Sequence, residues 1–173
     1  MFKLEKYGLS LDGESRLPDT IVPLLDQGVQ LGGHVHTLNG KCIDSAMDDS
    51  LKAQGVVFGS LDQSVTDHRE LLERVLLKRA FNGQFDRFAA LHAACWTGGQ
   101  FLYVPRGVHV TEPLHCLSAL CDGATDLGHT LVILEDGASA TLLTETASDA
   151  DDGGERGHPV RLVHVRIGEL AET

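Results

Sequence analysis

The sequence predicts an α+β protein: a mainly helical N-terminal region, residues 1–97, followed by the first coils of a β-helix, residues 98–173. Three observations lead to this fold class. Helical periodicity is clearest between residues 60 and 96, alternating apolar positions typical of strands follow Gly99, and a glycine-containing motif recurs about every 30 residues in that second part.

Composition and charge restrict the class of protein further. Of the 173 residues, 42% are hydrophobic, which is enough for an ordinary core and argues against disorder. The net charge of −11 argues against nucleic acid or an anionic membrane as partner, because phosphate binding requires clustered Lys and Arg. No apolar run approaches the ~20 residues that span a bilayer, and the N-terminus lacks a signal peptide. Four cysteines are too few for a disulfide scaffold, so we expect a cytoplasmic protein with reduced thiols.

The segment from Met1 to Phe58 carries weak periodicity and many turn signals. A short helix is expected to begin near Pro18 and to end at Gly28. The apolar segments 29–31 and 35–38 are predicted to pair as a hairpin across Gly32-Gly33. A further helical turn should run from Asp48 to Gly55 and lead into a strand or extended segment at 56–58.

Two helices are predicted between residues 60 and 96. Ser60 with Gln63 fits a capping box, and Asp67 with Glu70 fits a second one. One helical face then carries Leu71, Leu72, Val75 and Leu76. After the break at Asn82-Gly83, a second helix places apolar residues and one histidine along a stripe until Gly98-Gly99 ends it: Phe85, Phe88, Ala89, His92, Cys95 and Trp96.

The β-helix prediction depends on the internal repeat. Residues 104–110 align with residues 134–140, and a weaker third copy covers 165–171. The glycines at positions 107, 137 and 168 recur at nearly equal intervals, and a fixed period in this range is typical of stacked coils. The alternative is an antiparallel sandwich with evenly spaced hairpins. Residues 149–157 are too polar to pack and are predicted to form a loop. The apolar end of the last coil needs a cover, so we expect either a further C-terminal part of the protein or a partner to lie against it.

A metal site can be considered for five residues of the second part of the chain: His109, His115, Cys116, Cys121 and His129. Zinc or iron could use four such ligands. However, no closely spaced chelating pair is present, and Cys116 and Cys121 would point to opposite faces of one strand. We therefore assign no metal site and interpret these residues as buried thiols and as surface or hydrogen-bonded histidines.

Other candidate sites are equally sparse. His34 and His36 would share one face of a strand, but two ligands are too few for a metal site. No serine lies in a nucleophile elbow, and Cys95 falls on the apolar helical stripe. Pairs of carboxylates fall in predicted turns. The residues alone nominate no catalytic group, and a scaffold or interaction protein fits best.

Four stretches nevertheless resemble a known family in collinear order. They are Gly55 to Leu61, Asp67 to Leu72, Phe85 to Ala94 and Gly98 to Val108, and they are similar to the SufB/SufD family of iron–sulfur cluster assembly proteins. The resemblance extends over roughly residues 17–170, and its most specific part is residues 86–108. Relatives usually carry an Arg where this chain has His129.

The resemblance implies the N-terminal portion of a SUF scaffold component. It implies a right-handed parallel β-helix, a SufB-like partner, and contact with the SufC ATPase through the complex. The family's cluster-assembly residues and SufC-docking helices would lie beyond residue 173, so no assembly residue is transferred. We expect no cofactor on this fragment and an iron–sulfur cluster only on the assembled complex. We also expect the chain to be closer to SufD than to SufB, because it lacks the cysteine motif that some SufB N-termini carry.

Two other functions stay open at this point. One is a metal-dependent small-molecule enzyme that uses the His109–His129 region. The other is an inactive truncated remnant.

Overall fold

The computed structural model describes residues 28–73, 75–76, 87–121 and 124–148, and the backbone of two short strands at 160–161 and 165–166. Four helices are described: α1 Asp49–Ala53, α2 Leu61–Asp67, α3 Arg69–Glu73 and α4 Arg87–Cys95. The strands are β1 Gly33–Leu38, β2 Lys41–Met47, β3 Val57–Ser60, β4 Gly99–Val104, β5 Leu114–Leu120, β6 Thr125–Asp126, β7 His129–Leu134, β8 Leu142–Ser148, β9 Val160–Arg161 and β10 Val165–Arg166.

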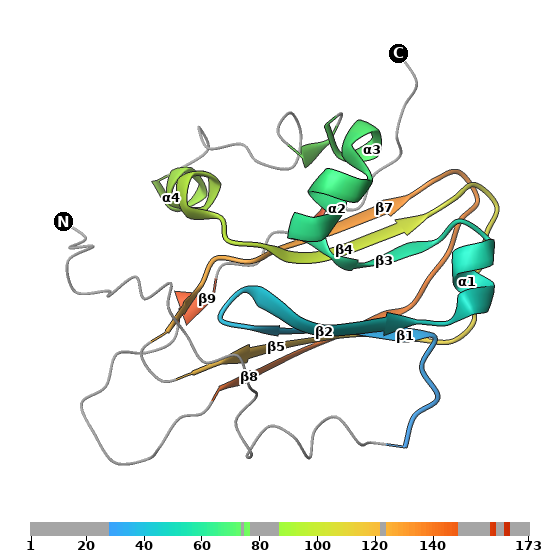
Figure 1. Ribbon diagram of the computed structural model, residues 1–173, viewed down its shortest axis with the longest axis horizontal. Helices are drawn as coiled ribbons and strands as arrows, with labels where there is room; N and C mark the ends of the chain where they lie inside the picture. The colour runs from blue at the N-terminus through green and yellow to red at the C-terminus, as the bar shows by residue number, and fades with distance from the viewer. Residues whose placement is uncertain are drawn as a thin grey trace.

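The described strands build two four-stranded sheets that face each other (Figure 1). Sheet A has the order β2-β1-β5-β8, and sheet B has the order β10-β7-β4-β3. The short strands β6 and β9 form a separate parallel pair. In sheet A, β1 pairs with β2 in antiparallel and with β5 in parallel. In sheet B, β4 pairs with β3 in antiparallel and with β7 in parallel. The antiparallel partners β2 and β3 come from the N-terminal region, and the parallel partners β5 and β7 come from the C-terminal region.

The parallel pairs confirm the first two copies of the repeat. Strand β4 pairs with β7 from Gly99↔His129 to Val104↔Leu134, which is the 30-residue offset of the repeat, and the bridge between His109 and Ser139 keeps the same offset. The turns behind these strands also stack, because the Gly107 amide donates to the Asp136 carbonyl at 3.0 Å and both Gly107 and Gly137 have φ of +70°. An antiparallel sandwich is therefore wrong for these strands.

The third copy of the repeat has a different register. Val165 pairs with Thr130, whereas the sequence alignment places Val165 opposite Leu134. The alignment follows the glycine at 168, and the backbone pairing of β10 does not keep that phase. The predicted loop at 149–157 lies outside the described residues.

The predicted hairpin in the N-terminal region is wrong. Residues 29–31 form no strand, and β1 pairs instead with β2 across Asn39-Gly40. Asn39 has φ of +52° and Gly40 has φ of +82°, the two positive values that a tight type I′ hairpin turn needs. The opposite edge of β1 pairs in parallel with β5.

The N-terminal region is not mainly helical in its described part, because three strands alternate there with four short helices. The turn of helix predicted after Asp48 is confirmed as α1, and the strand that follows is confirmed as β3. The first predicted capping box is confirmed in its N-cap half, because the Ser60 hydroxyl accepts the Gln63 amide at 3.5 Å. The helix predicted near Pro18 lies outside the described residues.

The core lies between the two sheets and takes residues from both parts of the chain. Its largest cluster has Val35, Val56 and Phe58 from the N-terminal region, and Leu102, Leu114 and Val132 from the C-terminal region. Strand alternation places every second side chain of β1, β4, β5 and β7 in this interior.

A buried polar chain crosses the same interior and links the sheets. The Thr130 hydroxyl donates to Gln100 Oε1 at 2.9 Å, and Gln100 Nε2 donates to Ser118 Oγ at 2.9 Å. The Thr37 hydroxyl also lies 3.2 Å from Ser118 Oγ. These hydrogen bonds satisfy side chains that would be costly to bury alone.

The outer face of sheet B is covered by α2 and α3, which lie above it in Figure 1. Leu72, Val75 and Leu76 pack there with Phe101 and Leu131, so the helical face predicted from the sequence is confirmed. The stripe predicted for α4 is confirmed only in part, because His92 is buried whereas Phe88 is 41% exposed.

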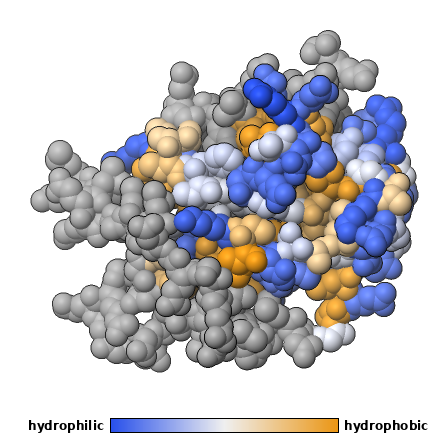
Figure 2. Space-filling view, viewed as in Figure 1, coloured by the Kyte–Doolittle hydropathy of each residue, from blue (hydrophilic) through white to orange (hydrophobic). Residues whose placement is uncertain are grey.

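The described helices are short. None of them is long and apolar enough to cross a bilayer. Hydrophilic residues gather around the end of the molecule that carries α1 (Figure 2). All four cysteines are free thiols.

Candidate functional site

Two histidines on β1 define the candidate site. Val35 and Thr37 face the interior between the sheets, so His34 and His36 lie on the outer face of sheet A. Their rings stack with centroids 4.4 Å apart. The parallel register pairs His34 with His115 on β5, and the His115 ring lies edge-on to His36 at 5.8 Å. Three imidazoles from two strands therefore meet on one face.

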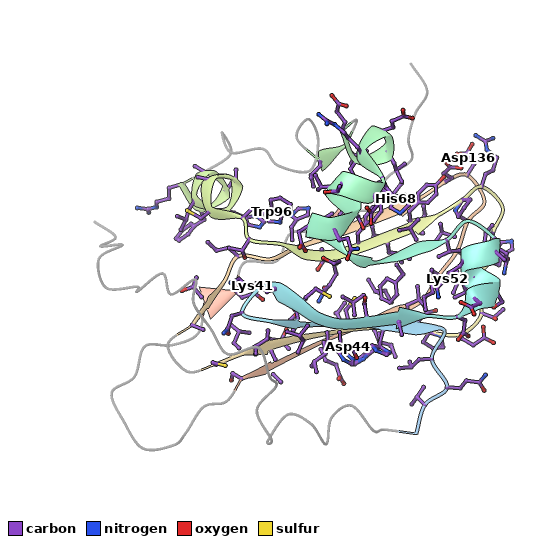
Figure 3. All side chains as sticks on the ribbon, viewed as in Figure 1. Lys41, Asp44, Lys52, His68, Trp96 and Asp136 are labelled. Carbon is purple, nitrogen blue, oxygen red and sulfur yellow. The ribbon has the colours of Figure 1, made fainter. Side chains whose placement is uncertain are left out.

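A β-bulge in β2 brings a carboxylate to the same face. Thr37 pairs with Cys42, but His36 pairs with Asp44, so Ile43 is the extra residue. In a regular ladder without the bulge, Ile43 would lie opposite His36 and Asp44 would lie opposite Val35 on the inner face, because a shift of one residue reverses the side-chain direction. In Figure 3, Asp44 lies on the side of β2 that faces away from sheet B.

The carboxylates contact the imidazoles directly. Asp44 Oδ2 lies 3.0 Å from His34 Nε2 and 3.6 Å from His36 Nδ1. On the neighbouring strands, Glu145 Oε2 lies 3.0 Å from His115 Nε2. The side chain of Asp44 is 63% exposed, whereas that of His36 is 8% exposed, so the cluster is buried at its floor and open at Asp44.

The surroundings keep His36 uncharged. Burial lowers the pKa of His36 to about 4, and the neighbouring histidines contribute to this lowering, while Asp44 acts in the opposite direction. Near neutral pH the His36 imidazole is therefore neutral.

The five metal candidates from the sequence lie in different parts of the fold. His109 is exposed and bonds Ser139 Oγ at 2.7 Å, whereas Cys116 is buried between the sheets. Cys121 packs beside Leu38 and Leu117, and His129 stacks on His92 in sheet B at 5.4 Å. Of the five, only His115 lies beside the His34–His36 pair.

Sequence reasoning recognises the pair on β1 but does not find its carboxylate partner. The available signal is Asn39-Gly40, a strong hairpin turn that places β2, and with it Asp44, beside β1. The bulge and the parallel pairing with β5 have no comparable local signal.

Comparison with known proteins supports one family. The family model described as "SufBD protein N-terminal region" matches residues 31–116, a range that contains His34, His36, Asp44 and His115. This part of the chain thus belongs to the SufBD family, and the resemblance recognised from the sequence is confirmed.

Individual relatives carry the corresponding names. The chain is 33% identical over 99 residues to the iron–sulfur cluster assembly protein SufD of Bacillus subtilis, and this match covers 57% of the chain and 23% of the relative. It is 33% identical over 94 residues to SufB of the same organism, covering 54% and 20%. A SufBD family protein of Synechocystis is 27% identical over 140 residues, covering 80% and 26%. The matches span about a quarter of each relative's length or less.

Proposed function

We propose that this chain is part of a scaffold of the SUF iron–sulfur cluster assembly machinery. The observation that carries the proposal is the match of residues 31–116 to the SufBD N-terminal region. Relatives similar in sequence are named for iron–sulfur cluster assembly. The role is structural rather than enzymatic, and the chain acts in the cytoplasm.

The same proposal gives the fold its finer description. We infer that β4, β5, β7 and β8 are the first coils of a right-handed parallel β-helix. Parallel pairing in the phase of the repeat and the stacked glycine turns at 107 and 137 support this inference. A β-helix stacks coil on coil, and each coil buries its apolar residues against its neighbours.

The partners follow from the family. The chain pairs with a SufB-like protein and reaches a SufC-type ATPase through the complex, and the cluster is held by that complex rather than by this fragment. The identity to SufB equals that to SufD, 33%. The SufD-like assignment therefore rests only on the absence of a SufB-type cysteine motif and stays a prediction.

Co-purification tests the proposal. The chain is produced with the SufB-like and SufC-like proteins of its own genome and isolated through a tag on the chain, and genes for these partners should lie near its own. We expect both partners in stoichiometric amounts, and expect them to be lost when Gly99→Ala, which disturbs the junction of β4 and β7, replaces the native chain. Recovery of a folded chain without either partner would contradict the proposal.

The two alternatives have weaker support. An enzyme that uses the His109–His129 region would need these side chains to converge. Instead, Cys116 lies between the sheets, His115 and His129 lie on the outer faces of different sheets, and His109 lies in a turn. An inactive remnant would be expected to melt without cooperativity, which thermal unfolding followed by circular dichroism would detect.

A further inference from the structure

We propose that His34, His36 and Asp44 form a binding site for a divalent transition-metal ion, with Zn²⁺ as the best match. The site lies on the outer face of sheet A, and the His115–Glu145 pair stands beside it. This inference is independent of the scaffold function proposed above.

The spacing of the ligand atoms fits one ion. Ligand atoms about 2.0–2.1 Å from a tetrahedral zinc lie about 3.3–3.4 Å from one another. The two distances from Asp44 Oδ2, 3.0 Å to His34 Nε2 and 3.6 Å to His36 Nδ1, fall on either side of that value. All three ligand atoms lie within 4.8 Å of one another, the only such group of three or more found across the described ranges.

The chemistry of the ligands selects the class of metal. Two imidazoles and one carboxylate suit zinc and its neighbours in the first transition row, whereas calcium and magnesium prefer oxygen ligands alone. Asp44 and Glu145 together would balance the charge of a dication. Because Asp44 is exposed, the remaining coordination positions are open to water or to a further ligand.

A simple hydrogen bond does not account for the whole arrangement. A His–Asp pair needs one ring, but here ring nitrogens of two stacked histidines approach the same carboxylate oxygen. The β2 bulge is what brings this oxygen to the histidine face. Bulges are enriched where a side chain must be redirected for function.

The second pair of residues supports the site from the neighbouring strands. His115 contacts His36 ring to ring at 5.8 Å, and Glu145 holds His115 Nε2 at 3.0 Å. A carboxylate that hydrogen-bonds a metal-ligating histidine raises the affinity of the site. Glu145 acts one step further out, because His115 packs against the ligand His36 and is not itself a ligand. We therefore assign Glu145 a positioning role.

Metal titration of the full chain tests the site. The protein is purified without a polyhistidine tag, treated with a chelator and titrated with Zn²⁺ by calorimetry and with Co²⁺ by visible absorption. We expect one ion per chain. His34→Gln and Asp44→Asn should each weaken binding at least about tenfold, and Glu145→Gln should weaken it by a smaller factor.

The matched control is His109→Gln. His109 is an exposed histidine with a single bond to Ser139, so its loss should leave the affinity unchanged. His34 is half-buried and Asp44 is exposed, so their variants should fold, which circular dichroism without metal verifies. His36→Gln is a secondary variant, because His36 is buried and its loss could disturb folding.

Three results would overturn the site. They are the absence of saturable binding at one ion per chain, equal affinity in the native chain and in both folded variants, and a thiolate-to-cobalt charge-transfer band that indicates cysteine ligands. Since partner co-purification does not depend on these residues, failure here and failure of the scaffold proposal are distinguishable.

Discussion

At the scale of single residues, the contact between β4 and β7 leaves no room for a side chain at Gly99. Its φ is +137°, and a Cβ atom there would overlap the carbonyl group of His129. We predict that Gly99→Ala destabilises the fold by about 3 kcal/mol, the sum of backbone strain and overpacking. Chemical denaturation followed by circular dichroism measures the loss.

Gly59→Ala is the matched control for that prediction. Gly59 also lies in a strand of sheet B, but a Cβ atom there would meet nothing within 4 Å, and the residue lacks a left-handed φ. Its substitution should change stability little. Equal losses in the two variants would show that the close approach at Gly99 does not govern stability.

A second prediction concerns the hydroxyl of Tyr103. It donates to Glu135 Oε1 at 2.8 Å, and burial together with this hydrogen bond and the glutamate charge raises the pKa of Tyr103 to about 12. Because the unfolded pKa is about 10, the stability from this group is present below pH 10 and is lost as the pH rises through 12.

Absorbance titration of tyrosinate tests that pKa. The chain has only one other tyrosine, Tyr7, and Tyr103→Phe isolates its signal. Glu135→Gln should move the Tyr103 transition part of the way toward pH 10, since burial remains. An ordinary transition near pH 10 in the folded native chain would contradict the interaction.

Local chemistry decides which residue-level features can be predicted. Asn39-Gly40 and Ser60 carry strong signals, because a left-handed turn and a helix cap each favour few residue types. The sequence pattern identifies Gly99 only as a helix stop. Its contact with His129 depends on a strand one repeat further along the chain, and no local pattern reports how closely the two backbones approach.

At the scale of elements, the polar chain between the sheets is a specific and testable link. Gln100 joins Thr130 of sheet B to Ser118 of sheet A. Gln100→Met keeps the length of the side chain but leaves the Thr130 hydroxyl without its acceptor. We predict a loss of about 2 kcal/mol in unfolding free energy, measured by denaturation.

An exposed glutamine provides the comparison for Gln100. Gln30 lies at the surface ahead of β1, so Gln30→Met should alter stability by less than about 0.5 kcal/mol. If Gln100→Met were as mild, the polar chain would contribute no more than a hydrophobic contact of the same volume.

Elements are predictable where periodicity and turn chemistry agree. The α1 turn, the β3 strand, the buried face of α3 and the first two repeats all carry both signals. The candidate site lacks them, because its histidines are visible on one strand but Asp44 needs the bulge, and His115 needs the parallel register of β1 with β5. The pairing of β1 with β5 joins the two parts of the chain, and the sequence contains no repeat that relates these two strands.

At the scale of the whole molecule, both parts of the chain build each sheet. β1 pairs with β5 and β3 with β4, and the shared core takes Val35 and Phe58 from one part and Leu102 and Leu114 from the other. The predicted boundary at 97/98 is therefore crossed by both sheets, and we expect the two parts to fold as one cooperative unit.

Dividing the chain at that boundary tests this expectation. A fragment of residues 98–173 would expose Leu102 and Leu114, which are 2% and 0% exposed in the whole chain, and would lose one neighbour of β4 and one of β5. We predict that it lacks a cooperative thermal transition by circular dichroism and that adding residues 1–97 in trans restores one. The control is the intact chain at equal concentration. A transition of the fragment alone at the same temperature as the intact chain would contradict the prediction, because it would mean that the stacked coils bury enough apolar surface among themselves to fold without β1 and β3.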